Sequence, residues 1–153
     1  MNKCIRGFSL IELLIVLAVV AILATIAYPA YLNHIATSRR SDAAGALVGL
    51  QAAMERYFTA NMTYAGSANS DGSPASALAY SSSVPIGGGT KTYDLSIAAP
   101  TTDCPIATCF LIRATPTGPQ TGDKCGTLTF TSKGQRGMSG AQPGLSVGDC
   151  WRN

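Results

Sequence analysis

A single carboxylate stands inside an otherwise apolar run. Glu12 follows Leu10 and Ile11, and the apolar character continues after it to Ala27. A charged side chain at the centre of a hydrocarbon layer costs on the order of 2 kcal/mol or more, and ionisable groups placed there usually have a partner and a function. The position of Glu12 therefore predicts that a positive charge pairs with it.

The cysteines are the second set of reactive side chains. Cys4 precedes the apolar run, and the other four lie near the C-terminus: Cys104, Cys109, Cys125 and Cys150. An even set in an exported domain predicts disulfides, and three pairings are open. We favour Cys104 with Cys109 and Cys125 with Cys150, since the second pair closes a loop of about 25 residues and adds roughly 3 kcal/mol in the chain-entropy model. A metal site is disfavoured because neither pair has the two-residue spacing of a zinc ribbon.

No arrangement of residues indicates catalysis. His34 is the only histidine, and no cysteine or acidic residue is placed around it as a ligand set. The run Gly87–Gly89 is not followed by the Lys-Ser/Thr pair of a phosphate-binding loop. The sequence also lacks a His-Glu-x-x-His motif, a nucleophile elbow and paired catalytic carboxylates. We therefore predict that the protein is not an enzyme and has neither a metal nor a cofactor.

The apolar run is long enough to cross a membrane as a helix. It extends over about 21 residues from Phe8 to Tyr28, which corresponds to roughly 31 Å of helix. A secretory signal cleaved near Thr25-Ile26-Ala27 is one alternative, and a permanent anchor is another. The length of the run and the cost of Glu12 in a discarded segment count against the signal peptide.

The junction before the run carries a specific motif. A short basic leader ends at Gly7, Phe8 follows it, and Glu12 and Pro29 stand downstream. This pattern resembles a type IV prepilin. The resemblance implies that a dedicated prepilin peptidase cuts after Gly7 on the cytoplasmic face and methylates the new amine of Phe8. It also implies a single-pass precursor in a bacterial inner membrane, an assembly machinery there, and a final place among other pilin subunits in a surface pilus.

The new amine offers Glu12 a partner. In a bundle of parallel apolar helices, the amine of Phe8 in one subunit and the carboxylate of Glu12 in its neighbour would each be uncompensated alone. Breaking a buried pair typically costs about 3 to 5 kcal/mol, so we expect the pair to set the register of assembly. The resemblance also implies that Glu12 aids methylation. The alternative is that Glu12 lies only at the level of the lipid headgroups.

Three segments follow from this interpretation. We expect residues 1–7 to be the cleaved leader, 8–36 the membrane and filament-core helix, and 37–153 a globular domain outside the membrane. Loss of Lys3 and Arg6 reduces eleven basic residues to nine, against eight acidic residues, which leaves a net charge of +1. This small charge argues weakly against a protein that binds nucleic acid through electrostatics.

The helical pattern continues beyond the membrane segment. We expect one long helix from about Ser9 to Phe58, bent at Pro29 because proline removes a backbone hydrogen bond. Its second half has an apolar face at helical spacing. Five charged residues are then expected on the solvent side: Arg39, Arg40, Asp42, Glu55 and Arg56. Gly45 and Gly49 either form a groove for a sheet or a neighbouring helix or reflect packing tolerance.

Short strands are expected after the helix. Runs rich in β-branched and aromatic residues at 92–98, 109–115 and 127–132 predict three strands, and a fourth is expected near Val84 or after Arg136. Short connections indicate an antiparallel meander that covers the apolar face of the helix. The fold class is α+β, which the resemblance identifies with the type IV pilin fold: a long kinked N-terminal helix on a small antiparallel sheet, with a C-terminal disulfide-bonded loop.

The C-terminal residues resemble one group within this family. Segments 125–130, 134–137 and 149–151 resemble the C-terminal region of PilE-like minor pilins of the Pseudomonas-type machinery. This resemblance implies a structural subunit, most simply a minor pilin, that supports pilus biogenesis, twitching motility or adhesion.

Two other functions are open. A competence pilin that binds DNA for uptake would use the cations near the C-terminal cysteines: Lys124, Lys133, Arg136 and Arg152. Asp123 and Asp149 lie among them, which fits a solvated face better. A type II secretion pseudopilin shares the N-terminal motif but often lacks cysteines in its globular part, so the four here favour the pilus.

Overall fold

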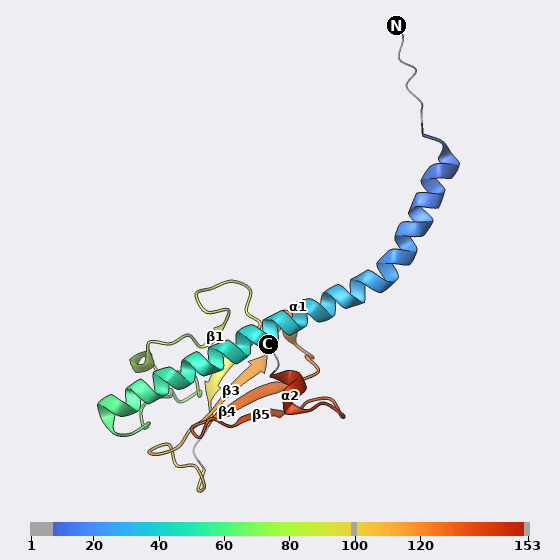
Figure 1. Cartoon of the computed structure of the whole chain (residues 1–153). Coiled ribbons are helices and arrows are strands. Elements are labelled where there is room, and N and C mark those ends of the chain that lie inside the picture. The colour runs from blue at the N-terminus through green and yellow to red at the C-terminus, as the bar shows by residue number, and fades with distance from the viewer. Residues whose placement is uncertain (1–7, 99–100, 152–153) are drawn as a thin grey trace. The chain divides into compact units, whose positions relative to one another are not determined.

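A long helix, a five-stranded sheet and a short C-terminal helix make up the chain (Figure 1). The computed structural model describes residues 8–98 and 101–151. The elements are, in chain order, α1 (Leu10–Asn61), η1 (Ser76–Leu78), β1 (Ser83–Val84), β2 (Tyr93–Ile97), β3 (Leu111–Pro116), η2 (Gly118–Gln120), β4 (Thr127–Thr131), β5 (Arg136–Ser139) and α2 (Val147–Cys150).

Helix α1 is one continuous helix of 52 residues. The carbonyl oxygen of Ser9 accepts the first hydrogen bond, from the backbone amide of Glu12 at 3.1 Å. Pro29 lies inside α1 and the helix continues beyond it, as the apolar spacing predicts. The bend expected at Pro29 stays a prediction. After Asn61 the chain leaves the helix at Met62, whose φ of 57° is left-handed.

The strands form one antiparallel sheet in the order β1-β2-β3-β4-β5. Each strand pairs with the next one in the chain, so the sheet is the expected meander. Buried residues alternate with more exposed ones along β2, β3 and β4, because successive side chains of a strand point to opposite faces. The three expected strands are present with slightly shifted ends, and β1 and β5 occupy both positions considered for a fourth.

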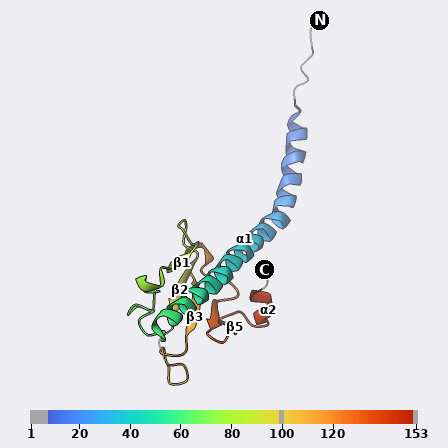
Figure 2. The same cartoon turned by 60° about the vertical axis from the view of Figure 1, so that its left-hand side comes forward.

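The core lies between one face of the sheet and the second half of α1 (Figure 2). The buried apolar residues of the helix are Ala43, Ala44, Ala46, Leu47, Leu50, Ala53 and Met54. The sheet contributes Tyr93, Leu95, Ile97, Ile112, Ala114, Leu128 and Phe130. All of them belong to Ala36–Asn153, one of two compact units of the chain; the other is Met1–Ile35. The globular unit therefore carries its own hydrophobic core.

The small residues of α1 have different roles. A Cβ atom at Gly49 would collide with the hydroxyl of Tyr80, which donates a hydrogen bond to the carbonyl oxygen of Ala46 at 2.8 Å. At Gly45, in contrast, no described atom lies within 4 Å of the position of a Cβ. Close approach thus occurs at Gly49 alone, and the group that approaches comes from the connection between α1 and β1.

Candidate functional site

The N-terminal segment presents the residues expected to act in assembly. Phe8 is 73% exposed and Glu12 lies in the first turn of α1. Every residue from Phe8 to His34 is exposed. By length and composition, α1 can cross a membrane. Gly7, the residue before the expected cleavage, lies outside the described residues.

Glu12 forms no ion pair with any other described residue. The ion pairs found in residues 8–98 and 101–151 are Arg40 with Asp123 and Lys91 with Asp94. A carboxylate at the centre of so apolar a segment is costly in lipid when it is unpaired. The geometry is therefore compatible with a partner on a second subunit, which is the role the sequence suggests for Glu12.

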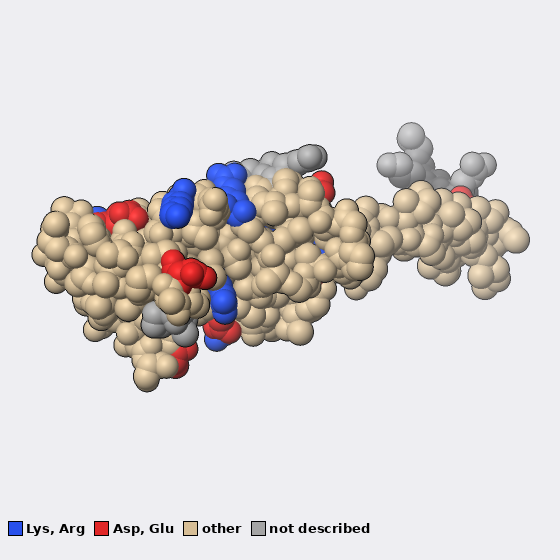
Figure 3. Space-filling model, turned by 90° about the horizontal axis from the view of Figure 1, so that it is seen from below, with Lys and Arg blue, Asp and Glu red and all other residues tan. Residues whose placement is uncertain are grey.

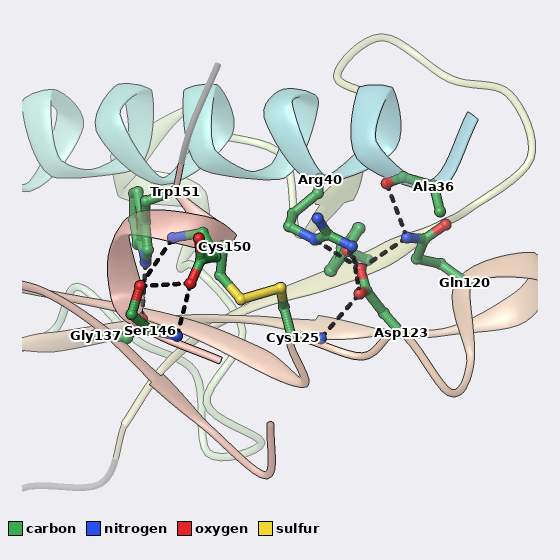
Figure 4. Close-up of a disulfide and its surroundings, with 11 residues drawn as sticks. Ala36, Arg40, Gln120, Asp123, Cys125, Gly137, Ser146, Cys150 and Trp151 are labelled. Atoms are coloured by element: carbon green, nitrogen blue, oxygen red, sulfur yellow. Dashed lines mark hydrogen bonds and ion pairs between the residues drawn. A yellow bond between two sulfur atoms is a disulfide. The ribbon is translucent and has the colours of Figure 1, made fainter. Parts of the chain in front are cut away.

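Two disulfides close loops of the globular unit. Cys125 bonds to Cys150 (Figure 4) and Cys104 bonds to Cys109, which are the two pairs that the sequence favours. Cys125 and Cys150 are buried, so their bond fixes α2 to the core, whereas Cys104 and Cys109 are half-buried in the loop before β3. Within the described ranges, no group of three or more His, Cys, Asp or Glu side chains could hold a metal ion.

Helix α2 fastens the C-terminal end to β5. Ser146 and Asp149 form a capping box, in which each side chain accepts a hydrogen bond from the backbone amide of the other residue. The indole Nε1 of Trp151 donates to the carbonyl oxygen of Gly137 at 2.8 Å. The guanidinium of Arg136 lies 5.4 Å from the ring centre of Trp151, within cation–π range. One face of the Arg136 guanidinium is therefore occupied by the Trp151 ring.

Arg40 is buried, which corrects its expected place on the solvent side of α1. The side chain of Arg40 is 6% exposed, and the side chain of Asp123 is 0% exposed. Arg40 Nε donates to Asp123 Oδ2 at 3.1 Å and Nη2 donates to Oδ1 at 2.7 Å (Figure 4). Such two-point pairs are strong and directional. The helical period could have revealed the burial, because Arg40 precedes Ala43 and Leu47 by three and seven residues and so shares their face.

Asp123 also accepts hydrogen bonds from three further donors. The Tyr93 hydroxyl and the Gln120 side-chain amide donate to Oδ2, the latter at 2.8 Å, and the backbone amide of Cys125 donates to Oδ1 at 3.0 Å. Gln120 donates in addition to the carbonyl oxygen of Ala36 at 3.1 Å. The carboxylate therefore connects α1, β2 and the turn before the buried disulfide. The sequence predicts that Asp123 lies on a solvated face. That prediction is wrong, because the Asp123 side chain is buried in this network.

These donors determine the charge state of the network. Burial alone would raise the pKa of Asp123, but the hydrogen bonds from Arg40, the Cys125 amide, Tyr93 and Gln120 outweigh it and lower the pKa to about 2. Burial, followed by the hydrogen bond to Asp123, raises the pKa of Tyr93 far above its usual value. At neutral pH Asp123 is therefore ionised and Tyr93 is neutral. These are the charge states that the salt bridge to Arg40 and the hydrogen bond from Tyr93 need.

The described basic residues near the C-terminal cysteines lie on different parts of the globular unit. Lys124 lies before β4 and Lys133 lies after it, and both are exposed. Arg136 contacts Trp151, and Arg152 lies outside the described residues. Among the described cations, Lys124 and Lys133 thus lie beyond opposite ends of β4, and Arg136 begins β5.

Arg113 is a basic residue that the sequence analysis did not single out. It is exposed in the middle of β3, between the buried Ile112 and Ala114. It lines a surface depression of about 470 Å³ together with Asp71 and Ser96. The alternation of apolar and polar residues around position 113 was the available signal, because it predicts an outward-facing arginine.

The sequence matches two family models. A family model described as "Type IV minor pilin ComP, DNA uptake sequence receptor" matches residues 29–129. A second, described as "Prokaryotic N-terminal methylation motif", matches residues 2–28. A solved type IV pilin from Shewanella oneidensis is 28% identical over 77% of this chain and 99% of its own, with a TM-score of 0.44. No curated protein matches the sequence.

Proposed function

Because the chain belongs to the type IV minor pilin family that includes ComP, we propose that it is a pilus subunit that binds DNA for uptake. The observation that carries the proposal is the family match over residues 29–129, which includes the globular half of α1 and strands β1 to β3. The precursor is anchored in the membrane through the apolar part of α1, and the mature subunit lies in a pilus on the cell surface.

Assembly begins at the N-terminus. The peptidase cuts after Gly7, and the released and methylated amine of Phe8 pairs with Glu12 of a neighbouring subunit. Residues 8–36 pass from lipid into an equally apolar filament core, while residues 37–153 stay outside. Apolar area removed from water is worth about 25 cal/mol per Å², so a filament built this way does not dissociate into water.

Processing has a direct test in the mass of the subunit. Intact mass and N-terminal sequencing of the chain recovered from sheared pili should give an N-methylated Phe8 as the first residue. A first residue at Met1 or at Tyr28 would contradict the assembly scheme, because Glu12 would then lack the proposed amine.

DNA binding is favoured over twitching motility and adhesion. All three roles suit a structural subunit, but the description of the matching family names a DNA receptor, and no contact among the described residues favours motility or adhesion. The subunit acts by binding and carries out no catalytic step. The matching family is one of pilus proteins, which also favours the pilus over a secretion pseudopilin.

The small net charge of the mature chain limits its electrostatic affinity for DNA. The mature side chains sum to nine basic against eight acidic residues. Figure 3 shows lysine and arginine side chains that stand apart on a largely uncharged surface, with acidic side chains among them. Non-specific affinity grows with the number of phosphates that cations neutralise. We therefore expect weak non-specific binding, with most of the useful affinity coming from hydrogen bonds to the DNA.

The binding test uses the mature chain in detergent micelles and labelled fragments of genomic DNA from the source bacterium. Fluorescence anisotropy should show saturable binding that excess unlabelled genomic DNA competes away more effectively than foreign DNA does. An absence of binding at low salt would refute the proposed function, since electrostatic attraction is strongest there.

A further inference from the structure

Hydroxyl groups line the face of the sheet that points away from α1. On β4 the outward residues are Thr127, Thr129 and Thr131, which alternate with buried Leu128 and Phe130. We call six outward residues of β3, β4 and β5 the hydroxyl face: Arg113, Thr115, Thr127, Thr129, Thr131 and Ser139. The core uses the opposite face of the sheet, so these side chains have no packing role there.

The centre of this face carries one arginine. The register places Arg113 of β3 on one side of Thr129 and Gly137 of β5 on the other. A Cβ atom at Gly137 would meet Thr129 Oγ1 at 2.6 Å, so the threonine side chain lies over the glycine. Arg113 is exposed and forms no ion pair with another described residue.

The nearest acidic groups lie beside the hydroxyl face and not on it. No outward position of β3, β4 or β5 holds a carboxylate. Asp94 of β2 is opposite Thr115, and its carboxylate pairs with Lys91 at 2.6 Å. Asp71 lines the depression beside Arg113, and its Oδ1 accepts hydrogen bonds from the amide and the hydroxyl of Ser73 at 2.9 and 2.6 Å. The outward positions of β3, β4 and β5 therefore hold no carboxylate, whereas Asp71 stays ionised beside Arg113, because hydrogen bonds from a neutral serine leave its charge in place.

Two exposed lysines mark the ends of the face. Lys124 precedes β4 and Lys133 follows it. Nine residues of chain span at most about 30 Å when extended, slightly less than the roughly 34 Å of one turn of B-DNA. Residues 124–126 form a turn, so one cation at the centre and one beyond each end extend over less than a single helical turn.

We propose that the hydroxyl face is the surface on which this pilin holds the DNA backbone, an inference that rests on the DNA-binding function proposed above. Arg113 contacts a phosphate, and the threonine hydroxyls donate to neighbouring phosphate oxygens. Arginine and hydroxyl side chains are both common phosphate ligands, and short side chains let a duplex approach the sheet closely. With at most three cations involved, the slope of log K against log salt is no steeper than about −3.

The test compares paired variants of the full mature chain in detergent micelles, with labelled genomic fragments at several salt concentrations. Arg113→Gln removes the central cation, and Thr129→Val removes a hydroxyl at nearly constant shape. The matched controls are Arg56→Gln and Thr59→Val, because both residues are exposed on α1, which covers the other face of the sheet. Thermal melting of each variant confirms that it is folded.

Arg113→Gln should weaken binding about tenfold and make the salt slope shallower by about 0.9. Thr129→Val should weaken binding about fivefold with the slope unchanged, and both controls should bind like the wild type. If the wild type binds while both test variants match it, the hydroxyl face is excluded and the DNA-binding function stands. If the wild type binds no DNA, the proposed function fails and the hydroxyl face fails with it.

Discussion

The guanidinium of Arg40 and the carboxylate of Asp123 meet across 83 residues of sequence in a buried, two-point salt bridge. Arg40 belongs to α1, and Asp123 lies in the turn that leads through Cys125 to β4. The same carboxylate accepts a hydrogen bond from Tyr93 of β2. One acidic side chain thus holds the helix, the sheet and the start of the disulfide-bonded loop together.

Loss of Arg40 should destabilise the globular unit strongly. Arg40→Met leaves Asp123 buried without its cation, which typically costs about 3 to 5 kcal/mol. The double variant with Asp123→Leu should recover part of that loss, because no unpaired charge then remains. Urea unfolding of the globular unit Ala36–Asn153 measures both. Lys91→Met, at a half-exposed pair, is the control and should cost less than about 1 kcal/mol. Equal effects of Arg40→Met and Lys91→Met would contradict the buried role.

The salt bridge should also make stability fall in acid. The folded pKa of Asp123 is about 2, below its unfolded value of about 3.9. A depressed folded pKa contributes stability that is complete above the unfolded pKa and is lost as the pH falls through the folded pKa. We expect a loss of about 2 kcal/mol between about pH 4 and pH 2. Between about pH 4 and pH 2, the free energy of unfolding should fall less in Asp123→Asn than in the wild type. An equal fall in the two proteins would rule the mechanism out.

The two disulfides should differ in their contribution to stability. Replacing Cys125 and Cys150 by serine opens the longer loop and should cost about 3 kcal/mol, whereas the same change at Cys104 and Cys109 should cost about 2 kcal/mol. The emission of Trp151, the only tryptophan, should move to longer wavelength in the first variant alone, because α2 is then released from the core. A shift of equal size in the Cys104 and Cys109 variant would mean that Trp151 depends on another contact.

Glu12→Ala should separate membrane insertion from assembly. The apolar segment is unchanged, so the protein should remain in the inner membrane, while sheared pili should lack it because the amine of Phe8 has no partner. Immunoblots of membrane and sheared fractions measure both. A Ser9→Ala variant, changed within the same turn of the chain, is the control and should enter pili normally. Normal amounts of Glu12→Ala in sheared pili would exclude the ion-pair role.

Elements that depend on local pattern could be predicted from the sequence. The spacing of apolar residues in α1 and the alternation in β2, β3 and β4 give their positions within a few residues, because these periods follow from backbone geometry. The count of cysteines predicts two disulfides and leaves three pairings open, of which the favoured one, Cys125 with Cys150 and Cys104 with Cys109, is the pairing in the structure. Local pattern was therefore sufficient for the positions of these elements, and the resemblance to type IV pilins added how they are arranged.

Features that depend on distant partners could not be predicted in this way. The helical period places Arg40 on the buried face of α1, but no local signal marks Asp123, 83 residues away, as its partner. The hydroxyl face is also non-local, since its centre exists only when the register brings Arg113 beside Thr129. Sequence reasoning grouped the C-terminal cations by their proximity in the chain, whereas an extended strand separates Lys124 from Lys133.

DNA uptake by living cells tests the central claim most directly. The gene for this chain would be deleted, and the entry of labelled genomic DNA into a DNase-resistant state would be measured in strains whose pili are counted in parallel. The proposed function predicts that uptake is lost while pili persist, and that the wild-type gene restores it whereas Arg113→Gln restores it only weakly. Normal uptake in the piliated deletion strain would contradict the claim that this subunit receives DNA.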